Sequence, residues 1–218
     1  MRGMILAAGR GERMRPLTDE KPKALLDVHG KPLIQYHVEK MVNVGVDYIV
    51  INQGHLGEKI EYALGDGRQF GIKIEYSPEG ETPLETGGGI FRALHLLEDS
   101  SFIAINADIW TDFDFSWLPD SPQGDAHLVL VDNPQHNNEG DFFLKDGRVM
   151  NQGTPRLTFS GIGVYTANLF HECVDGTFPL APLLRGAAEI GNVTGQYYGG
   201  TWIDVGTPER LQQLNETH

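Results

Sequence analysis

The chain has 218 residues, of which 40 % are hydrophobic, so its length and composition allow a proper core and exclude a disordered chain. Acidic residues outnumber basic ones by 30 to 17, and the resulting net charge of −13 argues against nucleic acids and anionic membranes as partners. The single cysteine, Cys173, cannot form a disulfide within the chain, which favours a reducing compartment.

The first predicted element is a short buried strand at residues 4–8, followed directly by Gly9-Arg10-Gly11. Unpaired backbone N–H groups at the end of such a strand can hold an anion, and glycine lets phosphate groups approach the backbone closely. Residues 10–23 contain five basic and three acidic side chains, which gives a local charge of +2 in an acidic protein. We therefore predict a polyphosphate-binding loop; the alternative is a surface loop whose arginines are only solvated.

Two common phosphate-binding loops are excluded at this position. The dinucleotide-binding fingerprint needs a third glycine where the chain has Met14, and no Gly-Lys-Ser/Thr sequence ends the loop. A nicotinamide-dependent oxidoreductase is correspondingly disfavoured.

A strand–loop–helix–strand unit opens the fold. Pro32 favours a helix start, apolar residues then repeat at helical spacing up to Gly45, and residues 46–51 form an almost continuous apolar strand. Such a unit predicts a parallel sheet with helices on both faces. The other predicted elements are an extended piece at 24–28, helices at 56–64, 179–190 and 208–214, strands at 72–76, 101–106, 127–131, 142–145, 159–165 and 201–205, and a polar loop at 132–141. We expect one α/β domain, residues 1–218, with a mixed, mostly parallel central sheet.

Two aspartates are candidate metal ligands. Asp108 follows a predicted central strand at its carboxyl end, where open α/β sheets place ligands, and Asp204 lies inside an otherwise apolar strand. A hard cation that bridges phosphate oxygens needs only one or two carboxylates. Each aspartate also has a structural interpretation, as a turn or helix cap for Asp108 and as a solvent-facing edge residue for Asp204. Their spacing does not show whether they meet.

Gly87–Gly89 form a second glycine cluster, directly before a predicted helix. Bare backbone at a helix start can lie against a nucleobase, ribose or sugar, and the alternative is a flexible loop. Glu85 and Thr86 can bond sugar hydroxyls or cap the helix. The sequence has no Gly-x-Ser-x-Gly motif and no histidine pair at metal-binding spacing, so covalent catalysis has no support.

Taken together, these motifs resemble the signature of sugar-1-phosphate nucleotidylyltransferases. The matching stretches are LAAGRGERMRPLT at 6–18, KPK at 21–23, PEG at 78–80, ETGGG at 85–89, Asn-Ala-Asp at 106–108 and WIDVGT at 202–207. Further stretches are similar to a small uridylyltransferase branch of that family that acts in cell-wall recycling: LETGGG at 84–89, DIWTD at 108–112, LVLVDNP at 128–134, LTFSG at 157–161 and LAPLLR at 180–185. The resemblance covers nearly the whole chain, in order.

The resemblance implies a Rossmann-like nucleotidyltransferase fold and a Mg²⁺-dependent reaction in which UTP and a sugar 1-phosphate give a UDP-sugar and pyrophosphate. The implied catalytic residues are Arg13, Lys23 and Asp108, with Asp108 and Asp204 as metal ligands. The implied nucleotide-binding residues are Ala8, Gly9, Gly11 and Gly80, and the implied sugar-facing residues are Glu85, Gly87, Asp141 and Gly161.

Two alternatives to this function stay open. Glucose or mannose 1-phosphate, or another nucleotide, would support the same chemistry, and a non-catalytic sugar-nucleotide-binding protein would share the pocket. The family commonly has glycine where this chain has Ala107, and a positive φ would strain an alanine there. The sequence shows no secretory signal, no bilayer-spanning stretch and no added C-terminal domain, so we expect a cytoplasmic monomer.

Overall fold

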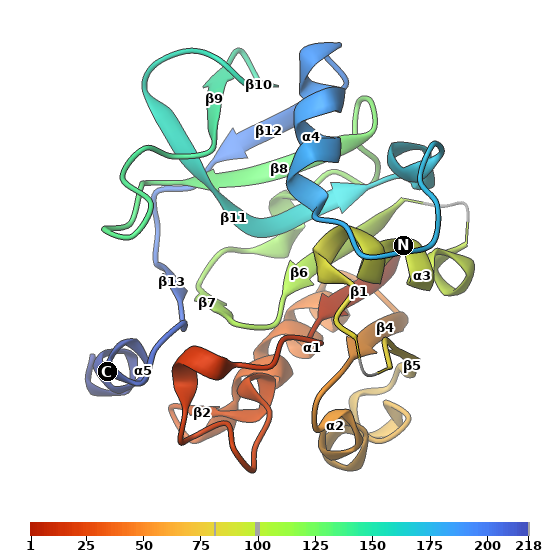
Figure 1. The fold of residues 1–218 in the computed structure, drawn as a ribbon, viewed down its shortest axis with the longest axis vertical. Helices are drawn as coiled ribbons and strands as arrows, with labels where there is room; N and C mark the ends of the chain where they lie inside the picture. Colours follow the sequence, from red (N-terminus) through yellow and green to blue (C-terminus); the bar gives the residue numbers. More distant parts are fainter. Residues whose placement is uncertain (81, 99–100, 218) are drawn as a thin grey trace.

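The computed structural model describes residues 1–80, 82–98 and 101–217. The strands of its central sheet are β1 Arg2–Leu6, β4 Tyr48–Gln53, β5 Lys73–Pro78, β6 Phe102–Asn106, β8 Ala126–Val131, β9 Phe142–Lys145, β10 Arg148–Met150, β11 Arg156–Tyr165 and β12 Val193–Tyr197. Their order is β5-β4-β1-β6-β11-β8-β12-β10-β9, nine strands within the described residues (Figure 1).

One half of this sheet is parallel and the other half is mixed. β5, β4, β1 and β6 run parallel, with Leu6 paired to Asn52 on one side and to Asn106 on the other. β11 runs antiparallel to β6 and β8, whereas β12 and β8 are parallel. The predicted mixed sheet is confirmed, but its antiparallel share is larger than expected. One reason is the Asp146-Gly147 turn between β9 and β10, with φ values of 50° and 74°, because so short a turn joins only antiparallel strands.

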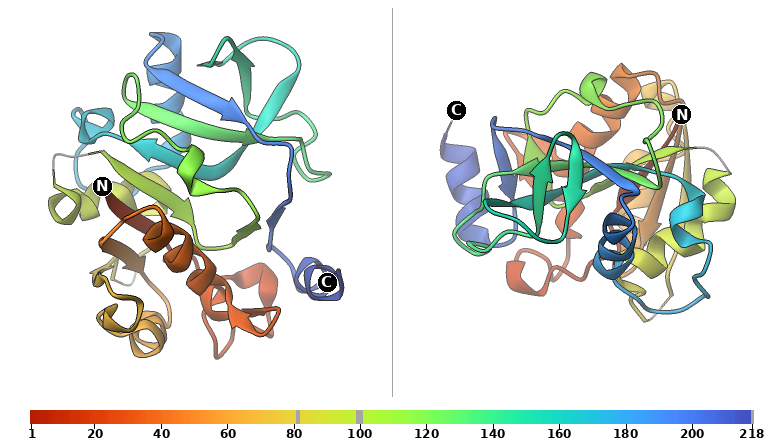
Figure 2. Two further views of the ribbon diagram at one scale, coloured as in Figure 1. Left: turned by 180° about the vertical axis from the view of Figure 1, so that it is seen from behind. Right: turned by 90° about the horizontal axis from the view of Figure 1, so that it is seen from above.

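Helices cover both faces of the sheet, as predicted (Figure 2). Their bounds are α1 Leu33–Asn43, α2 Gly57–Leu64, α3 Glu85–Leu97, α4 Leu180–Glu189 and α5 Pro208–Glu216. Side chains alternate along a strand, so Ile5 of β1 packs in the core beneath α1 and α2, while Met4 packs in the core beneath α3 and α4. No helix in the described ranges combines the length and apolar character needed to cross a membrane.

The C-terminal segment returns to the loop that follows β1. Two small ladders are formed by β7 Ile109–Thr111 with β13 Trp202–Asp204, and by β2 Asp27–Val28 with β3 Lys31–Pro32. α5 begins after Thr207, whose hydroxyl accepts the Arg210 N–H, and it packs through Leu211 on a third core that contains Met14. Figure 1 shows α5 beside β2.

Two local predictions need correction. The predicted extended piece at 24–28 begins as a 3₁₀ turn, Lys23–Leu25, and only Asp27–Val28 is extended. The cluster Gly87–Gly89, expected before a helix, forms the first turns of α3 and is buried there. Tertiary packing overrides the low helix propensity of glycine at this point.

Candidate active site

Two adjoining cavities open at the carboxyl ends of the parallel strands. One of about 230 Å³ is lined by Ala8 and Gly9 after β1 and by Ala107 and Asp108 after β6. The other, of about 520 Å³, shares Ala8 and Glu79 with the first. Ligands of open α/β sheets bind at this edge, where the sequence predicted the site.

A buried hydrogen-bond network contributes Asn52 to the lining of the first cavity and Glu79 to the lining of both. Asn52 Oδ1 accepts the Ala7 N–H at 2.7 Å, and Asn52 Nδ2 donates to Glu79 Oε1 at 2.6 Å. The other carboxylate oxygen of Glu79 accepts the Leu84 N–H at 2.8 Å. Asn52 and Glu79 are 3 % and 6 % exposed, so these bonds are shielded from water and fix the chain around the site. Sequence reasoning identified neither residue; the available signal was a polar Asn at the end of an apolar strand.

The predicted nucleotide-binding glycines differ in what they do. Gly9 lines the first cavity and Gly80 the second. A Cβ on either residue would meet no atom of the described chain within 4 Å, so the backbone there is open to a ligand. Gly11 lines neither of these cavities. Its φ is +65°, and a Cβ would lie 2.9 Å from Thr18, so the turn after β1 explains this glycine, and its contact with a nucleotide stays a prediction.

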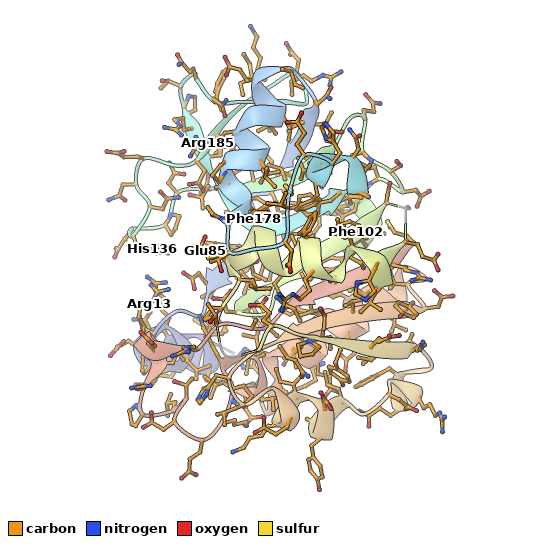
Figure 3. The ribbon with its side chains drawn as sticks, turned by 45° about the vertical axis from the view of Figure 1, so that its right-hand side comes forward. Arg13, Glu85, Phe102, His136, Phe178 and Arg185 are labelled. Atoms are coloured by element: carbon orange, nitrogen blue, oxygen red, sulfur yellow. The ribbon has the colours of Figure 1, made fainter. Side chains whose placement is uncertain are left out.

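Lys23 and Asp108 meet in the first cavity. Lys23 Nζ lies 2.7 Å from Asp108 Oδ2, and the lysine side chain is 12 % exposed. The fold therefore brings the basic loop to the candidate metal aspartate. Arg13 is exposed and lines neither of these cavities. Figure 3 shows Arg13 on the same side of the molecule as Glu85.

A buried histidine of α1 lies close to Asp108. His37 is 1 % exposed, and it packs against the backbone of Ala107 and Ile109, on either side of Asp108. Burial lowers the pKa of His37 to about 4, although the negative charge of Asp108 opposes this shift. The imidazole is therefore neutral at pH 7 and adds no charge beside Asp108.

Asp204 lies on the segment next to Asp108. In the ladder of β7 and β13, Asp204 is opposite Ile109, and the Val205 N–H donates to the Asp108 carbonyl oxygen at 2.9 Å. The two carboxylates are thus carried by hydrogen-bonded neighbouring segments. Asp204 lines neither of the first two cavities; it lines a third, of about 410 Å³, which Asp108 does not line. The Asp204 side chain is partly buried, at 19 % exposed, and pairs with Arg210.

The carboxylate oxygens of Asp108 and Asp204 suit a hard divalent cation. Mg²⁺ prefers oxygen ligands and is commonly held by one or two carboxylates, with phosphate and water completing its shell. Asp204 Oδ1 is buried without a hydrogen-bond partner among the described residues, and such an oxygen is costly unless a cation or donor satisfies it. Residues 1–80, 82–98 and 101–217 contain no group of three or more His, Cys, Asp or Glu side chains suited to a metal, so a substrate would have to complete the shell.

Two of the predicted sugar-facing residues lie at the start of α3. Glu85 is exposed, lines the first cavity and has a φ of +59°, an uncommon conformation that is typical of ligand sites when it occurs outside glycine. A Cβ on Gly87 would lie 2.6 Å from the Phe178 ring and 2.8 Å from its carbonyl oxygen. Packing of α3 therefore explains this glycine, and its contact with a sugar stays a prediction.

The other two predicted sugar-facing residues are Gly161, in β11, and Asp141, directly before β9. Gly161 sits in a bulge of β11 with a φ of +79°, and a Cβ there would lie 2.6 Å from Nδ2 of Asn106, which lines the first cavity. Asp141 Oδ2 accepts the Phe159 N–H at 2.8 Å and an Asn137 amide N–H at 3.2 Å. Asp141 thus anchors the loop between β8 and β9, and its sugar contact also stays a prediction.

The alanine at the position where the family commonly has glycine is unstrained. Ala107 is absent from the described non-glycine residues with positive φ, and its N–H donates to the Leu6 carbonyl oxygen at 3.0 Å. Its methyl group packs in the core beneath α1. The conformational strain considered for this position does not occur.

Comparisons with known proteins agree with this arrangement. Residues 2–142 match the model of the nucleotidyl transferase family. An N-acetylmuramate alpha-1-phosphate uridylyltransferase of Neisseria meningitidis is 50 % identical, over 98 % of this chain and 96 % of the relative. One of Caulobacter vibrioides is 34 % identical, over 94 % and 92 %.

Among solved structures, a putative glucose-1-phosphate thymidylyltransferase from Bacillus anthracis, in complex with sucrose, has a TM-score of 0.82 at 21 % identity. The match covers 99 % of this chain and 94 % of that one, which confirms the Rossmann-like fold expected from the sequence. Because the family model spans more than half of the chain and close relatives span nearly all of it, the chain belongs to the nucleotidyl transferase family and is a nucleotidyltransferase.

Proposed function

We propose that this protein transfers a uridylyl group from UTP to N-acetylmuramic acid 1-phosphate, giving UDP-N-acetylmuramic acid and pyrophosphate. The substrates are supported by the N-acetylmuramate alpha-1-phosphate uridylyltransferase that is 50 % identical over 98 % of the chain. The observation that carries the chemistry is the ion pair of Lys23 and Asp108, at 2.7 Å, in a cavity whose wall includes the open backbone of Gly9.

The reaction is a direct in-line displacement at phosphorus. An oxygen of the sugar 1-phosphate forms a bond to the α-phosphorus of UTP, the bond from that phosphorus to the bridging oxygen breaks, and its electron pair leaves with pyrophosphate. The phosphate monoester is already ionised at pH 7, so no general base is required. Both reactants are anions, and the protein therefore contributes positioning and charge neutralisation.

The chain's own residues divide this work. The backbone at Ala8, Gly9 and Gly80 receives the nucleotide, because these residues line the cavities and their surroundings leave room for it. Lys23 neutralises charge that develops on the phosphate oxygens, and we assign the same role to Arg13. Mg²⁺ held by Asp108 and Asp204 would add charge stabilisation on the same oxygens.

Glu85 is the residue that we assign to the sugar. Glu85 lines the first cavity at the start of α3, and sugar hydroxyls are good donors to carboxylates. A Glu85→Ala variant is expected to raise KM for the sugar 1-phosphate and to leave KM for UTP nearly unchanged.

We also propose that residues 1–218 act as one domain and that the enzyme works in the cytoplasm in cell-wall recycling. The central sheet takes strands from Arg2 to Tyr197, and α5 packs with β2 on a shared core, which supports one domain. The single cysteine supports a reducing compartment.

A pyrophosphate-release assay with a panel of substrates tests this proposal. N-acetylmuramic acid, glucose and mannose 1-phosphates are each combined with UTP, dTTP, GTP and ATP. The highest kcat/KM is expected for UTP with N-acetylmuramic acid 1-phosphate. A higher value for another pair would assign the same chemistry to that pair. Binding of UDP-sugar without pyrophosphate release from any pair would identify a sugar-nucleotide-binding protein instead.

A further inference from the structure

The two carboxylate oxygens of Asp204 have different surroundings. Oδ2 lies 3.0 Å from Arg210 Nη1 and 3.3 Å from His136 Nε2. Oδ1 is buried and, in the described structure, has no hydrogen-bond partner. A Cβ on Gly206 would lie 2.9 Å from this oxygen, so only a glycine fits against Oδ1 at this position. One oxygen is therefore held by the protein, and the other has no donor among the described residues.

Arg210 is the centre of this arrangement. Its Nη1 also donates to the Asp204 carbonyl oxygen at 3.2 Å, and its Nη2 donates to His136 Nδ1 at 2.9 Å. The backbone of Arg210 is fixed in the first turn of α5 by the Thr207 cap. A planar guanidinium with several partners presents its donors in a fixed direction, which a flexible ammonium cannot do.

His136 links the same carboxylate to the loop between β8 and β9. Arg210 Nη2 can only donate, so His136 Nδ1 accepts and the ring proton lies on Nε2, the nitrogen that faces Asp204 Oδ2. The next residue, Asn137, bonds Asp141 at 3.2 Å and Thr158 at 3.1 Å, which ties this loop to β11. Figure 3 shows His136 on the side of the molecule that carries Glu85 and Arg13.

We propose that Arg210 and His136 are positioning residues for the metal site: they hold Oδ2 of Asp204 and leave Oδ1 for the cation that Asp204 shares with Asp108. This inference rests on the proposed function, because that function supplies the cation. Partners of a metal-binding carboxylate orient it, and their removal typically lowers metal affinity about 10–100-fold. The opposite role is a competing ion pair, in which Arg210 neutralises Asp204 and weakens its binding of the cation. The two roles predict changes of opposite sign.

The test measures Mn²⁺ binding by the full chain at saturating UMP. The readout is the electron paramagnetic resonance signal of the Mn²⁺ that remains free. The variants are Arg210→Gln, Arg210→Lys, His136→Ala and His136→Gln. The matched control is Arg68→Gln, because Arg68 also pairs with an aspartate, Asp66, at 3.0 Å but is 89 % exposed and lines none of the three cavities. Thermal denaturation checks that each variant is folded, and the Lys and His136 variants carry the test if Arg210→Gln does not fold.

We expect Arg210→Gln to bind Mn²⁺ about 10–100-fold more weakly than the wild type, with Arg210→Lys in between and Arg68→Gln unchanged. His136→Gln, which retains a donor, should lose less affinity than His136→Ala. The Mg²⁺ concentration for half-maximal pyrophosphate release should rise by a similar factor, while KM for UTP at saturating Mg²⁺ changes little.

Unchanged or tighter Mn²⁺ binding by Arg210→Gln would overturn the positioning role, and tighter binding would favour the competing pair. Absence of Mn²⁺ binding by the wild type would overturn both the cation site and this inference. Failure of the proposed function is recognised separately, since wild-type protein would then release no pyrophosphate from the substrate panel.

Discussion

Replacement of Lys23 by alanine tests the residue on which the proposed chemistry depends most. The change removes an ammonium that is 12 % exposed and lies 2.7 Å from Asp108 Oδ2. Two unit charges about 4 Å apart, at an effective dielectric constant of about 20, interact by about 4 kcal/mol. Loss of one transition-state charge partner in other enzymes costs about 3–4 kcal/mol, so kcat/KM should fall by about 10²–10³.

Lys21 provides a matched control two residues away. Its Nζ also pairs with an aspartate, Asp27, at 2.6 Å, but the side chain is 42 % exposed and lies outside the three cavities. Exposed pairs of this kind contribute about 0–1 kcal/mol, so Lys21→Ala should keep kcat/KM within about fivefold of the wild-type value.

The assay is the initial rate of pyrophosphate release with UTP and N-acetylmuramic acid 1-phosphate, at saturating Mg²⁺ and after circular dichroism has shown that both variants are folded. A folded Lys23→Ala protein with nearly wild-type kcat/KM would refute the reasoning. Equal losses in the two variants would attribute the effect to the net charge of the loop, and not to the position of Lys23.

Two further predictions concern the support of the site. A methyl group on Gly89 would clash with Glu79 Oε1 and lie 2.7 Å from Asn52 Nδ2, so Gly89→Ala should lower the free energy of unfolding by about 1–3 kcal/mol and weaken UTP binding. Denaturant titration measures this change. Gly186→Ala is the control, because it lies at a helical position with open space around it and should be neutral or stabilising. A similar loss of unfolding free energy in both variants would contradict the prediction. Burial lowers the pKa of His37 from 6.5 to about 4, so between these pH values the unfolded chain binds a proton that the folded protein does not. The free energy of unfolding should therefore fall as pH falls through this window, by about 3 kcal/mol from this group. In denaturant titrations at pH 7 and 4.5, the His37→Leu variant should lack that part of the loss. Equal losses in the variant and the wild type would contradict the assignment.

The sequence predicted best those elements that are buried on both faces. Residues 48–51 and 102–105 are continuous apolar runs because β4 and β6 lie between two helical layers. β12 was missed because Gly195 and polar residues interrupt its pattern, although it is paired with β8. β10 was missed because it is only three residues long, despite the Asp146-Gly147 turn signal before it.

The residue types in the sequence predicted which side chains belong to the site, but their arrangement in space follows only from the fold. The sequence identified Lys23 and Asp108, but they meet because β1 and β6 are neighbours in the sheet, a fact of topology that a single sequence does not contain. The glycine cluster was interpreted as a ligand surface, whereas Gly88 is required by the close approach of the Gly176 carbonyl oxygen. The partners of Asp204 come from distant segments and carry no local signal.

The central claim is that Asp108, Asp204 and Lys23 converge on one cation-bound nucleotide. A crystal structure with Mn²⁺ and UTP, in which the metal is located by its anomalous scattering, tests this claim most directly. We predict one Mn²⁺ at about 2.0–2.3 Å from a carboxylate oxygen of Asp108 and from Oδ1 of Asp204, with Lys23 at the phosphates. A metal that is bound by the phosphates alone, or by a carboxylate elsewhere, would contradict it.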